Sequence, residues 1–153
     1  MRVYRIALEL YAKTARAAFS GIGGMYGLGR WHTQGRPVVY AAESLSLSAL
    51  EAVVHLKRST RIEPHVRWEA EIPDGLMEEA KNLPADWILN MKATQAYGDA
   101  WLAGRSAPAL VVPSAIIPAE RNVVINPLHP AFDLAWVVVG PVPFEFDTRL
   151  VAP

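Results

Sequence analysis

Short alternating or apolar segments run through this chain, and they predict more strands than helices. Residues 2–8 and 66–72 place side chains alternately on two faces, which is typical of strands. The other predicted strands are short apolar runs that stop near proline or glycine, at residues 37–42, 109–112, 122–125, 134–139 and 142–146. Because the strands mostly follow one another along the chain, the pattern favours the α+β class over a doubly wound parallel sheet.

Helical periodicity is strongest from Ser44 to about Arg58. Apolar side chains recur there at i, i+3 and i+7, which predicts an amphipathic helix with Glu51 on a polar face beside the apolar stripe. Ser48 and Glu51 also have the spacing of a capping box, so Glu51 could cap a helix that begins later, or pair with His55. Weaker helical patterns cover residues 11–19, 76–82 and 94–102.

Two features of the N-terminal region bear on where a cleft would lie. Residues 20–29 contain five glycines, which predicts a loop with unusual backbone freedom. In the first predicted strand, Tyr4, Ile6 and Leu8 share a strongly apolar face. If that face is the core, Arg5 points the other way, into the cleft that the sheet borders.

Composition narrows the class of protein. The 153 residues suffice for one domain with its own core, expected to span residues 1–153. The 15 basic and 15 acidic side chains balance, so the basic patch of a nucleic-acid binding protein is lacking. There is no cysteine, and the four histidines lack metal-ligand spacing, so we expect neither a disulfide nor a metal site. The sequence has no secretory signal and no apolar window of about 18 residues, which predicts a cytoplasmic protein that does not span a membrane.

Three residues with complementary chemistry lie between Gly29 and Leu56. Arg30 follows the glycine-rich segment, and a guanidinium offers a fork of donors that suits phosphate oxygens. Tyr40 interrupts an aliphatic strand, where its ring could stack on a flat cationic ring. Glu51 could stabilise a positively charged sugar. Each also has an ordinary alternative: a surface arginine, a core tyrosine and a helix-capping glutamate.

Further candidates lie later in the chain and beside Arg30. Ser114 stands between prolines in VPSAIIP, where an extended backbone would present its hydroxyl, although a polar turn residue is the alternative. Asn122 belongs to ERNVVINPLHPAF, whose proline-containing turns offer a similar alternative. Trp31 is expected to line the cleft. The other tryptophans are expected in the core: Trp68, Trp87, Trp101 and Trp136.

Taken together, six segments resemble the RES family, the toxin half of RES–Xre toxin–antitoxin pairs. The segments are YRI (4–6), GRWH (29–32), PVVYAAES (37–44), LEAVVHL (50–56), VPSAIIP (112–118) and ERNVVINPLHPAF (120–132). They stand in the family's order and span most of the chain. The arginine, glutamate and serine that give the family its name correspond to Arg30, Glu51 and Ser114, with Tyr40 and Arg5 as further cleft residues.

The resemblance implies a fold similar to that of ADP-ribosyltransferase toxins, a split and mostly antiparallel sheet with a cleft for NAD, and it implies NAD as the substrate. Arg30, helped by Arg5, would clamp the pyrophosphate, and Tyr40 would hold the nicotinamide face. Glu51 would stabilise the charged ribose or position the acceptor, and Ser114 would hydrogen-bond the ribose or the carboxamide. The remaining residues expected to contact NAD are Trp31 and Asn122.

The resemblance leaves the acceptor of the ADP-ribose open. Water or phosphate would make the protein a NAD-depleting toxin that arrests growth, which we favour because no target-docking segment is recognisable. A side chain of a cellular protein would make it a mono-ADP-ribosyltransferase. A non-catalytic binding module is a remote alternative, and a direct pair between Arg30 and Glu51 in a closed site would favour it. The expected protein partner is an Xre-type antitoxin that covers the cleft or its entrance.

Overall fold

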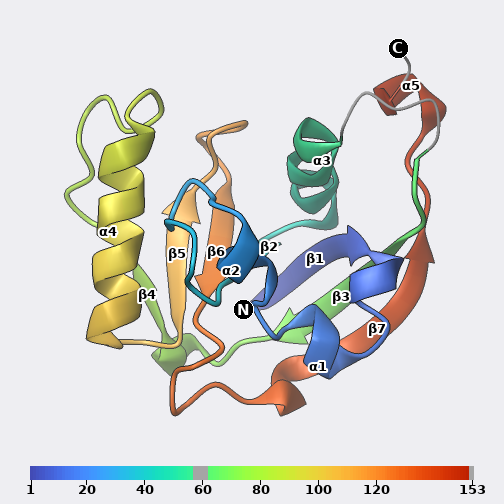
Figure 1. Ribbon diagram of the computed structural model, residues 1–153, viewed down its shortest axis with the longest axis horizontal. Coiled ribbons are helices and arrows are strands. Elements are labelled where there is room, and N and C mark those ends of the chain that lie inside the picture. The colour runs from blue at the N-terminus through green and yellow to red at the C-terminus, as the bar shows by residue number, and fades with distance from the viewer. Residues whose placement is uncertain (57–61, 152–153) are drawn as a thin grey trace.

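The computed structural model describes residues 1–56 and 62–151 and folds around one seven-stranded sheet (Figure 1). The strands are β1 (Arg2–Leu8), β2 (Val39–Ala42), β3 (His65–Glu71), β4 (Met77–Glu79), β5 (Ala109–Pro113), β6 (Arg121–Ile125) and β7 (Val137–Phe144). Their spatial order is β4-β5-β6-β2-β1-β3-β7. Every neighbouring pair is antiparallel except β4 and β5, which are parallel.

Helices flank the sheet on both halves. The α-helices are α1 (Ala15–Ala18), α2 (Gly23–Tyr26), α3 (Leu45–His55), α4 (Met91–Gly104) and α5 (Thr148–Val151), with 3₁₀ turns at Glu9–Tyr11, Asp74–Leu76 and Leu134–Trp136. α4 lies along the β4-β5-β6 side of the molecule, and α3 lies near β1 and β2 (Figure 1). Within residues 1–56 and 62–151, no helix combines the length and apolar character needed to cross a bilayer.

The sheet divides into two halves between β1 and β2. β1 pairs with β3 along its whole length, from Arg2 to Leu8, whereas β1 and β2 meet at one register pair, Tyr4 with Ala42. β5 and β6 run in a different direction from β1, β3 and β7 (Figure 1). The fold therefore confirms the predicted α+β class and the split, mostly antiparallel sheet.

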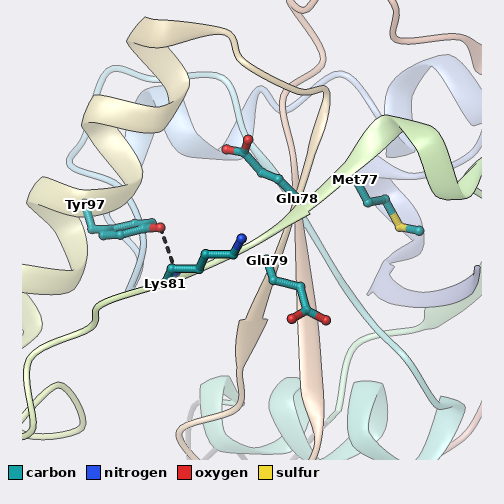
Figure 2. A pocket seen from close by; sticks show the side chains of 5 residues that line it. All are labelled: Met77, Glu78, Glu79, Lys81 and Tyr97. Atoms are coloured by element: carbon teal, nitrogen blue, oxygen red, sulfur yellow. Dashed lines mark hydrogen bonds between the residues drawn. The ribbon is translucent and has the colours of Figure 1, made fainter.

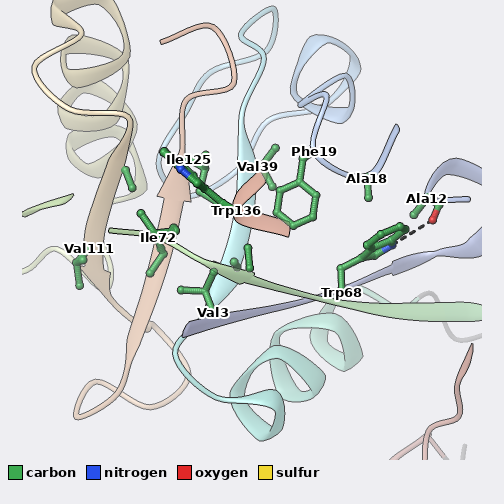
Figure 3. Packing of buried hydrophobic residues seen from close by; sticks show 14 of the residues in the cluster. Val3, Ala12, Ala18, Phe19, Val39, Trp68, Ile72, Val111, Ile125 and Trp136 are labelled. Atoms are coloured by element: carbon green, nitrogen blue, oxygen red, sulfur yellow. Dashed lines mark hydrogen bonds between the residues drawn. The ribbon is translucent and has the colours of Figure 1, made fainter. Parts of the chain in front are cut away.

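The main hydrophobic core, here called the first cluster, draws on both halves of the sheet. Val3 and Trp68 contribute from β1 and β3, and Val39 and Ile125 contribute from β2 and β6 (Figure 3). The indole N–H of Trp68 donates to the carbonyl of Ala12 (3.1 Å), which satisfies a buried polar group. The two halves are thus joined mainly by shared burial of apolar side chains.

A second cluster fills the space between α4 and the opposite face of β2, β5 and β6. Strand register places Tyr40, Val124 and Leu110 side by side on that face. The buried members of this second cluster are Trp31, Val38, Trp101, Leu102, Leu110, Val112 and Val124. This face also carries Asn122, because Asn122 pairs with Ala42 and Val112, two residues along each strand.

The predicted helix at residues 76–82 is wrong. Leu76 ends a 3₁₀ turn, and β4 pairs in parallel with Ala109–Val111 of β5. Methionine and glutamate favour helices by only a few tenths of a kcal/mol each, roughly. The edge of β5 offers backbone hydrogen-bond partners that outweigh this preference, and the N–H of Ala80 extends the pairing by donating to Val111 (2.9 Å).

The N-terminal boundaries also differ from the predictions. The single helix predicted at residues 11–19 is instead a 3₁₀ turn followed by α1. Thr14 separates the two, because its side chain accepts the N–H of Ala17 and caps α1 (3.2 Å). The predicted loop at residues 20–29 contains the one-turn helix α2.

Later boundaries shift in a similar way. The two strands predicted at residues 134–139 and 142–146 are a 3₁₀ turn followed by the continuous strand β7. α4 extends beyond residues 94–102 in both directions, and Asn90 caps it by accepting from Ala93 (3.1 Å). α3 ends at His55, and its predicted end at Arg58 lies outside the described residues.

The expectation about the faces of β1 is wrong. Val3 is 1% exposed in the first cluster, and Arg5 follows two residues later on the same face. Tyr4, Ile6 and Leu8 on the other face are half-buried. Arg5 therefore enters the interior on the side of the first cluster.

Candidate active site

Glu51 lies in the second turn of α3. The side chain of Ser44 accepts the N–H of Leu47 (3.1 Å), so Ser44 is the N-cap of this helix. The hydroxyl of Ser48 instead accepts the N–H of Ile6 on β1 (3.1 Å). The capping-box alternative for Glu51 is therefore wrong, and its carboxylate turns to other partners.

The Glu51 carboxylate joins a hydrogen-bonded group that we call the carboxylate cluster: Glu51, Ser114 and Asn122. Oε1 of Glu51 accepts from Oγ of Ser114 (2.9 Å) and from Nδ2 of Asn122 (2.5 Å). Ser114 is fully buried, and its hydroxyl also accepts the backbone N–H groups of Ile116 and Ile117. The Ser114 hydroxyl is thus engaged inside the protein, which differs from the expected direct contact with a ribose or carboxamide.

The charge of Glu51 lacks a cationic partner within the described residues. The ion pairs there involve other carboxylates, and both donors in the carboxylate cluster are neutral. The side-chain oxygen of Asn122, Oδ1, is buried without a hydrogen-bond partner. Unpaired polar atoms in a buried position cost free energy, and here one lies beside a carboxylate without a cationic partner, which makes this cluster a candidate functional site.

Arg30 and Glu51 bond to different partners. Nη1 of Arg30 donates to the carbonyl oxygens of Ile88 (3.0 Å) and Trp87 (3.4 Å), in the segment before α4. Arg30 is half-buried and forms no ion pair with Glu51. The direct pair that would favour a non-catalytic binding module is therefore not observed.

Tyr40 and Asn122 come together through strand register. Tyr40 pairs with Val124, and Asn122 pairs with Ala42. Tyr40 and Asn122 are therefore diagonal neighbours on one face, a relation that places Cα atoms roughly 7–8 Å apart. Strand register thus places Tyr40 two residues from Asn122, a member of the carboxylate cluster, on the same face of the sheet.

A chain of hydrogen bonds links Tyr40 to the segment that carries Arg30. The Tyr40 hydroxyl accepts the N–H of Trp31 (3.1 Å) and contacts Nδ1 of His32 (2.8 Å), while Nε2 of His32 contacts the carbonyl of Gly27 (3.2 Å). A carbonyl only accepts, so Nε2 carries the proton and the Tyr40 hydroxyl donates to Nδ1. Burial raises the pKa of Tyr40 and lowers that of His32. Both side chains are therefore neutral at neutral pH.

We expect the neutral His32 to make stability depend on pH. Because its pKa is lowered in the folded protein, the unfolded chain binds a proton first as the pH falls through 6.5. The contribution of His32 to the free energy of unfolding should be complete above pH 6.5. It should then decrease as the pH falls from 6.5 toward the lower pKa of His32 in the folded protein. Urea unfolding of the wild type and His32→Asn at several pH values checks this.

The stability advantage of the wild type over His32→Asn should shrink between pH 7.5 and 5.5. His55→Gln, which removes an exposed histidine from α3, controls for the loss of a histidine as such. An advantage that stays constant over this range would contradict a neutral, buried His32.

Two other predicted residues lie inside the protein. Arg5 donates from Nε to the carbonyl of Ala18 and from Nη1 to the carbonyl of Tyr40, both at 2.9 Å. Burial lowers its pKa to about 10, and the two carbonyls tie α1 to β2 through it. Trp31 is 2% exposed and stacks on Trp87 with ring centroids 6.2 Å apart. The Arg5 guanidinium is thus bound by backbone carbonyls, and Trp31 lies in the second cluster.

The contacts that α4 makes with the segment around Arg30 were not predicted from the sequence. Nε2 of Gln95 donates to the carbonyl of Gly29 (2.9 Å), and the carboxylate of Asp99 accepts the N–H and hydroxyl of Thr33. Each of these pairs is separated by more than sixty residues in sequence, so a local sequence pattern cannot predict the contact. The sequence signal for this face is two polar residues, Gln95 and Asp99, spaced i, i+4 around Gly98.

A surface hollow lies beside β4 (Figure 2). Its lining residues are Met77, Glu78, Glu79, Lys81 and Tyr97. The backbone N–H of Lys81 donates to the Tyr97 hydroxyl across it (3.0 Å). None of the residues singled out from the sequence lines this hollow, so the candidate site rests on the carboxylate cluster and its neighbours.

Comparisons with known proteins give matches over nearly the whole chain. The RES domain family model matches residues 2–147. A protein named Toxin Res from Yersinia enterocolitica is 33% identical, with 98% of this chain and 99% of that protein covered. A Toxin Res from Photorhabdus laumondii is 36% identical, with 99% and 97% covered.

Two further matches are a relative with a different name and a solved structure. A protein from Sphingobium sp. named Prs ADP-ribosylating toxin is 36% identical, with 83% of each chain covered. The crystal structure of the M. tuberculosis MbcT–MbcA toxin–antitoxin complex contains a chain that matches with a TM-score of 0.69, covering 98% of this chain and 86% of that one. At 16% identity, this structural match supports the fold alone.

Proposed function

This chain belongs to the RES domain family, and from that premise we propose that it is the toxin of a toxin–antitoxin pair and cleaves NAD at the nicotinamide–ribose bond. The observation that carries the proposal is the Glu51 carboxylate, held through Oε1 by two neutral donors and lacking a cationic partner within the described residues. Loss of nicotinamide leaves positive charge on the ribose, as in other reactions with an oxocarbenium-like transition state. A fixed carboxylate stabilises that charge as it develops.

Arg30 is proposed to bind the pyrophosphate of NAD. Its guanidinium already donates to two neutral carbonyl oxygens, of Trp87 and Ile88. Charged phosphate oxygens form stronger hydrogen bonds with a guanidinium, so they would replace these carbonyls when NAD binds. Tyr40 is proposed to contact the nicotinamide through its ring, because its hydroxyl is engaged with Trp31 and His32.

The remaining candidates are proposed to act indirectly. Ser114 and Asn122 hold Oε1 of Glu51, which orients Oε2 for the ribose. Arg5 braces the carbonyl of Tyr40 against α1 instead of clamping the pyrophosphate. Trp31 supports the segment that carries Arg30 from within the second cluster.

Water or phosphate is the acceptor that we propose, which makes the protein a NAD-depleting toxin that arrests growth in the cytoplasm. The second candidate is transfer of ADP-ribose to a cellular protein. The name of the Sphingobium relative, a Prs ADP-ribosylating toxin, favours this candidate. In both cases the same bond breaks, so Glu51, Arg30 and Tyr40 keep their proposed roles.

The proposed protein partner is an antitoxin of the Xre type. The structural neighbour comes from a toxin–antitoxin complex, and the relatives named Toxin Res cover nearly the whole chain. We propose that residues 1–153 act together as one catalytic domain and that the antitoxin covers the cleft or its entrance.

NAD consumption and protein labelling, measured together, test the proposed function. Purified protein free of antitoxin is mixed with NAD and a cell lysate, with Glu51→Gln as the matched inactive control. We expect rapid NAD loss by the wild type and intact-mass spectra without added ADP-ribose. Release of nicotinamide is followed at the same time, because it reports cleavage of the proposed bond.

The outcomes separate the candidates. NAD loss in proportion to one labelled protein would replace the depletion proposal with ADP-ribosyl transfer and identify the target. NAD loss no faster than that of Glu51→Gln would overturn both and leave a non-catalytic role.

A further inference from the structure

One face of α4 is built to hold the segment that carries Arg30. Gln95, Gly98 and Asp99 are spaced i, i+3 and i+4, so they share that face. Asp99 accepts the N–H (3.0 Å) and hydroxyl (2.6 Å) of Thr33, and it forms an ion pair with Nε of Arg36 (2.9 Å). The side chain of Asp99 is 15% exposed, whereas its partners Thr33 and Arg36 are more exposed.

Gln95 makes the contact nearest to Arg30. Its Nε2 donates to the carbonyl of Gly29, which belongs to the peptide group immediately before Arg30. The peptide group immediately after Arg30 is held by its own donor, the N–H of Trp31, which bonds to the Tyr40 hydroxyl. The backbone of Arg30 is therefore fixed on both sides, once by α4 and once by β2.

The local packing leaves this backbone little room to shift. A Cβ on Gly29 would lie 2.6 Å from the Tyr40 hydroxyl and 2.7 Å from the His32 ring. A Cβ on Gly98 would lie 1.9 Å from the carbonyl oxygen of Trp31. Gly29 and Gly98 thus allow the segment around Arg30 to pack closely against β2 and α4. A side chain at either position would prevent this packing.

We propose that Gln95 is a positioning residue for Arg30: by holding the Gly29 carbonyl, it aims the guanidinium at the pyrophosphate of NAD. This inference rests on the proposed function, in which Arg30 binds the pyrophosphate. It assigns α4 a part in substrate binding, although Gln95 itself does not touch the substrate. The side chain acts through backbone geometry, so its loss should weaken NAD binding more than it slows the bond cleavage.

A double-mutant cycle tests the inference. Gln95→Met keeps the length of the side chain and removes its donor without adding charge. We expect the KM for NAD to rise about five-fold, the size typical of one lost hydrogen bond, with kcat unchanged within about two-fold. In an Arg30→Ala background the same substitution should leave KM unchanged, because no guanidinium remains to be aimed.

A matched control and a second readout complete the design. Gln34→Met makes the same exchange at an exposed position of the same segment and should leave both constants unchanged. Hydrogen–deuterium exchange of residues 29–33 should speed up in Gln95→Met and not in Gln34→Met.

Each result has a definite reading. An increase in KM that persists in the Arg30→Ala background, or a loss confined to kcat, would overturn the positioning role. Faster exchange together with a wild type that consumes no NAD would overturn the proposed function and leave Gln95 as an anchor of the segment alone.

Discussion

Glu51→Gln is expected to lower the kcat for NAD cleavage by at least about 100-fold, the usual scale for removing one group that stabilises transition-state charge. Glutamine has nearly the same shape, and its carbonyl oxygen can still accept from Ser114 and Asn122. The substitution thus removes the negative charge and leaves the carboxylate cluster largely in place.

The effect on NAD binding should be small. Bound NAD has not yet developed the positive charge on its ribose, so Glu51 stabilises the transition state more than the bound substrate. Steady-state kinetics combined with calorimetric titration of NAD measures the two effects separately. Glu9→Gln removes one negative charge at an exposed position and serves as the control.

A kcat within about three-fold of the wild type would contradict the assigned role. A large loss of NAD affinity with kcat preserved would also contradict it, because Glu51 would then act as a binding residue. An Arg30 variant is instead expected to show mainly a higher KM for NAD. Comparing the two variants therefore distinguishes a charge-stabilising group from a phosphate-binding group.

The candidate residues that could be predicted from sequence are those whose chemistry conflicts with their local pattern. Glu51 beside the apolar stripe of a helix, and Tyr40 within an aliphatic strand, each stand out against their neighbours. The local pattern does not show which side chains these residues contact. Ser114 and Asn122 lie 63 and 71 residues from Glu51, and strand register brings them together.

The predictions that the structure contradicts share a physical origin: contacts between residues distant in sequence outweigh the local preference of a segment. β4 is a strand because the edge of β5 offers hydrogen bonds to a segment of weak helix formers. Trp31 was expected in the cleft because it follows Arg30 in the sequence. In the structure it packs with residues of α4 in the second cluster. The alternation of β1 predicts that Arg5 points away from the core into a cleft, but the first cluster forms on its side of the strand.

The approach of α4 leads to the second large effect: Gly98→Ala should lower the free energy of unfolding by about 3 kcal/mol, at the upper end of the usual cost of overpacking. The added Cβ would meet the backbone of Trp31, with its carbonyl oxygen at 1.9 Å and its carbonyl carbon at 2.7 Å. A flexible side chain could rotate away, but this backbone is held by Tyr40 through the Trp31 N–H. The helix must therefore move outward and open the second cluster.

Gly104→Ala is the matched control for this prediction, because it makes the same exchange in the last residue of the same helix. A Cβ on Gly104 meets no atom within 4 Å, and alanine favours helices over glycine by up to about 1 kcal/mol, so this variant should be as stable as the wild type or slightly more stable. Chemical denaturation of both variants measures the difference. Equal stabilities would contradict the close approach of α4 to Trp31. If Gly98→Ala is less stable and, where still folded, also has a raised KM for NAD, then the packing of α4 that closes the second cluster also sets the position of Arg30.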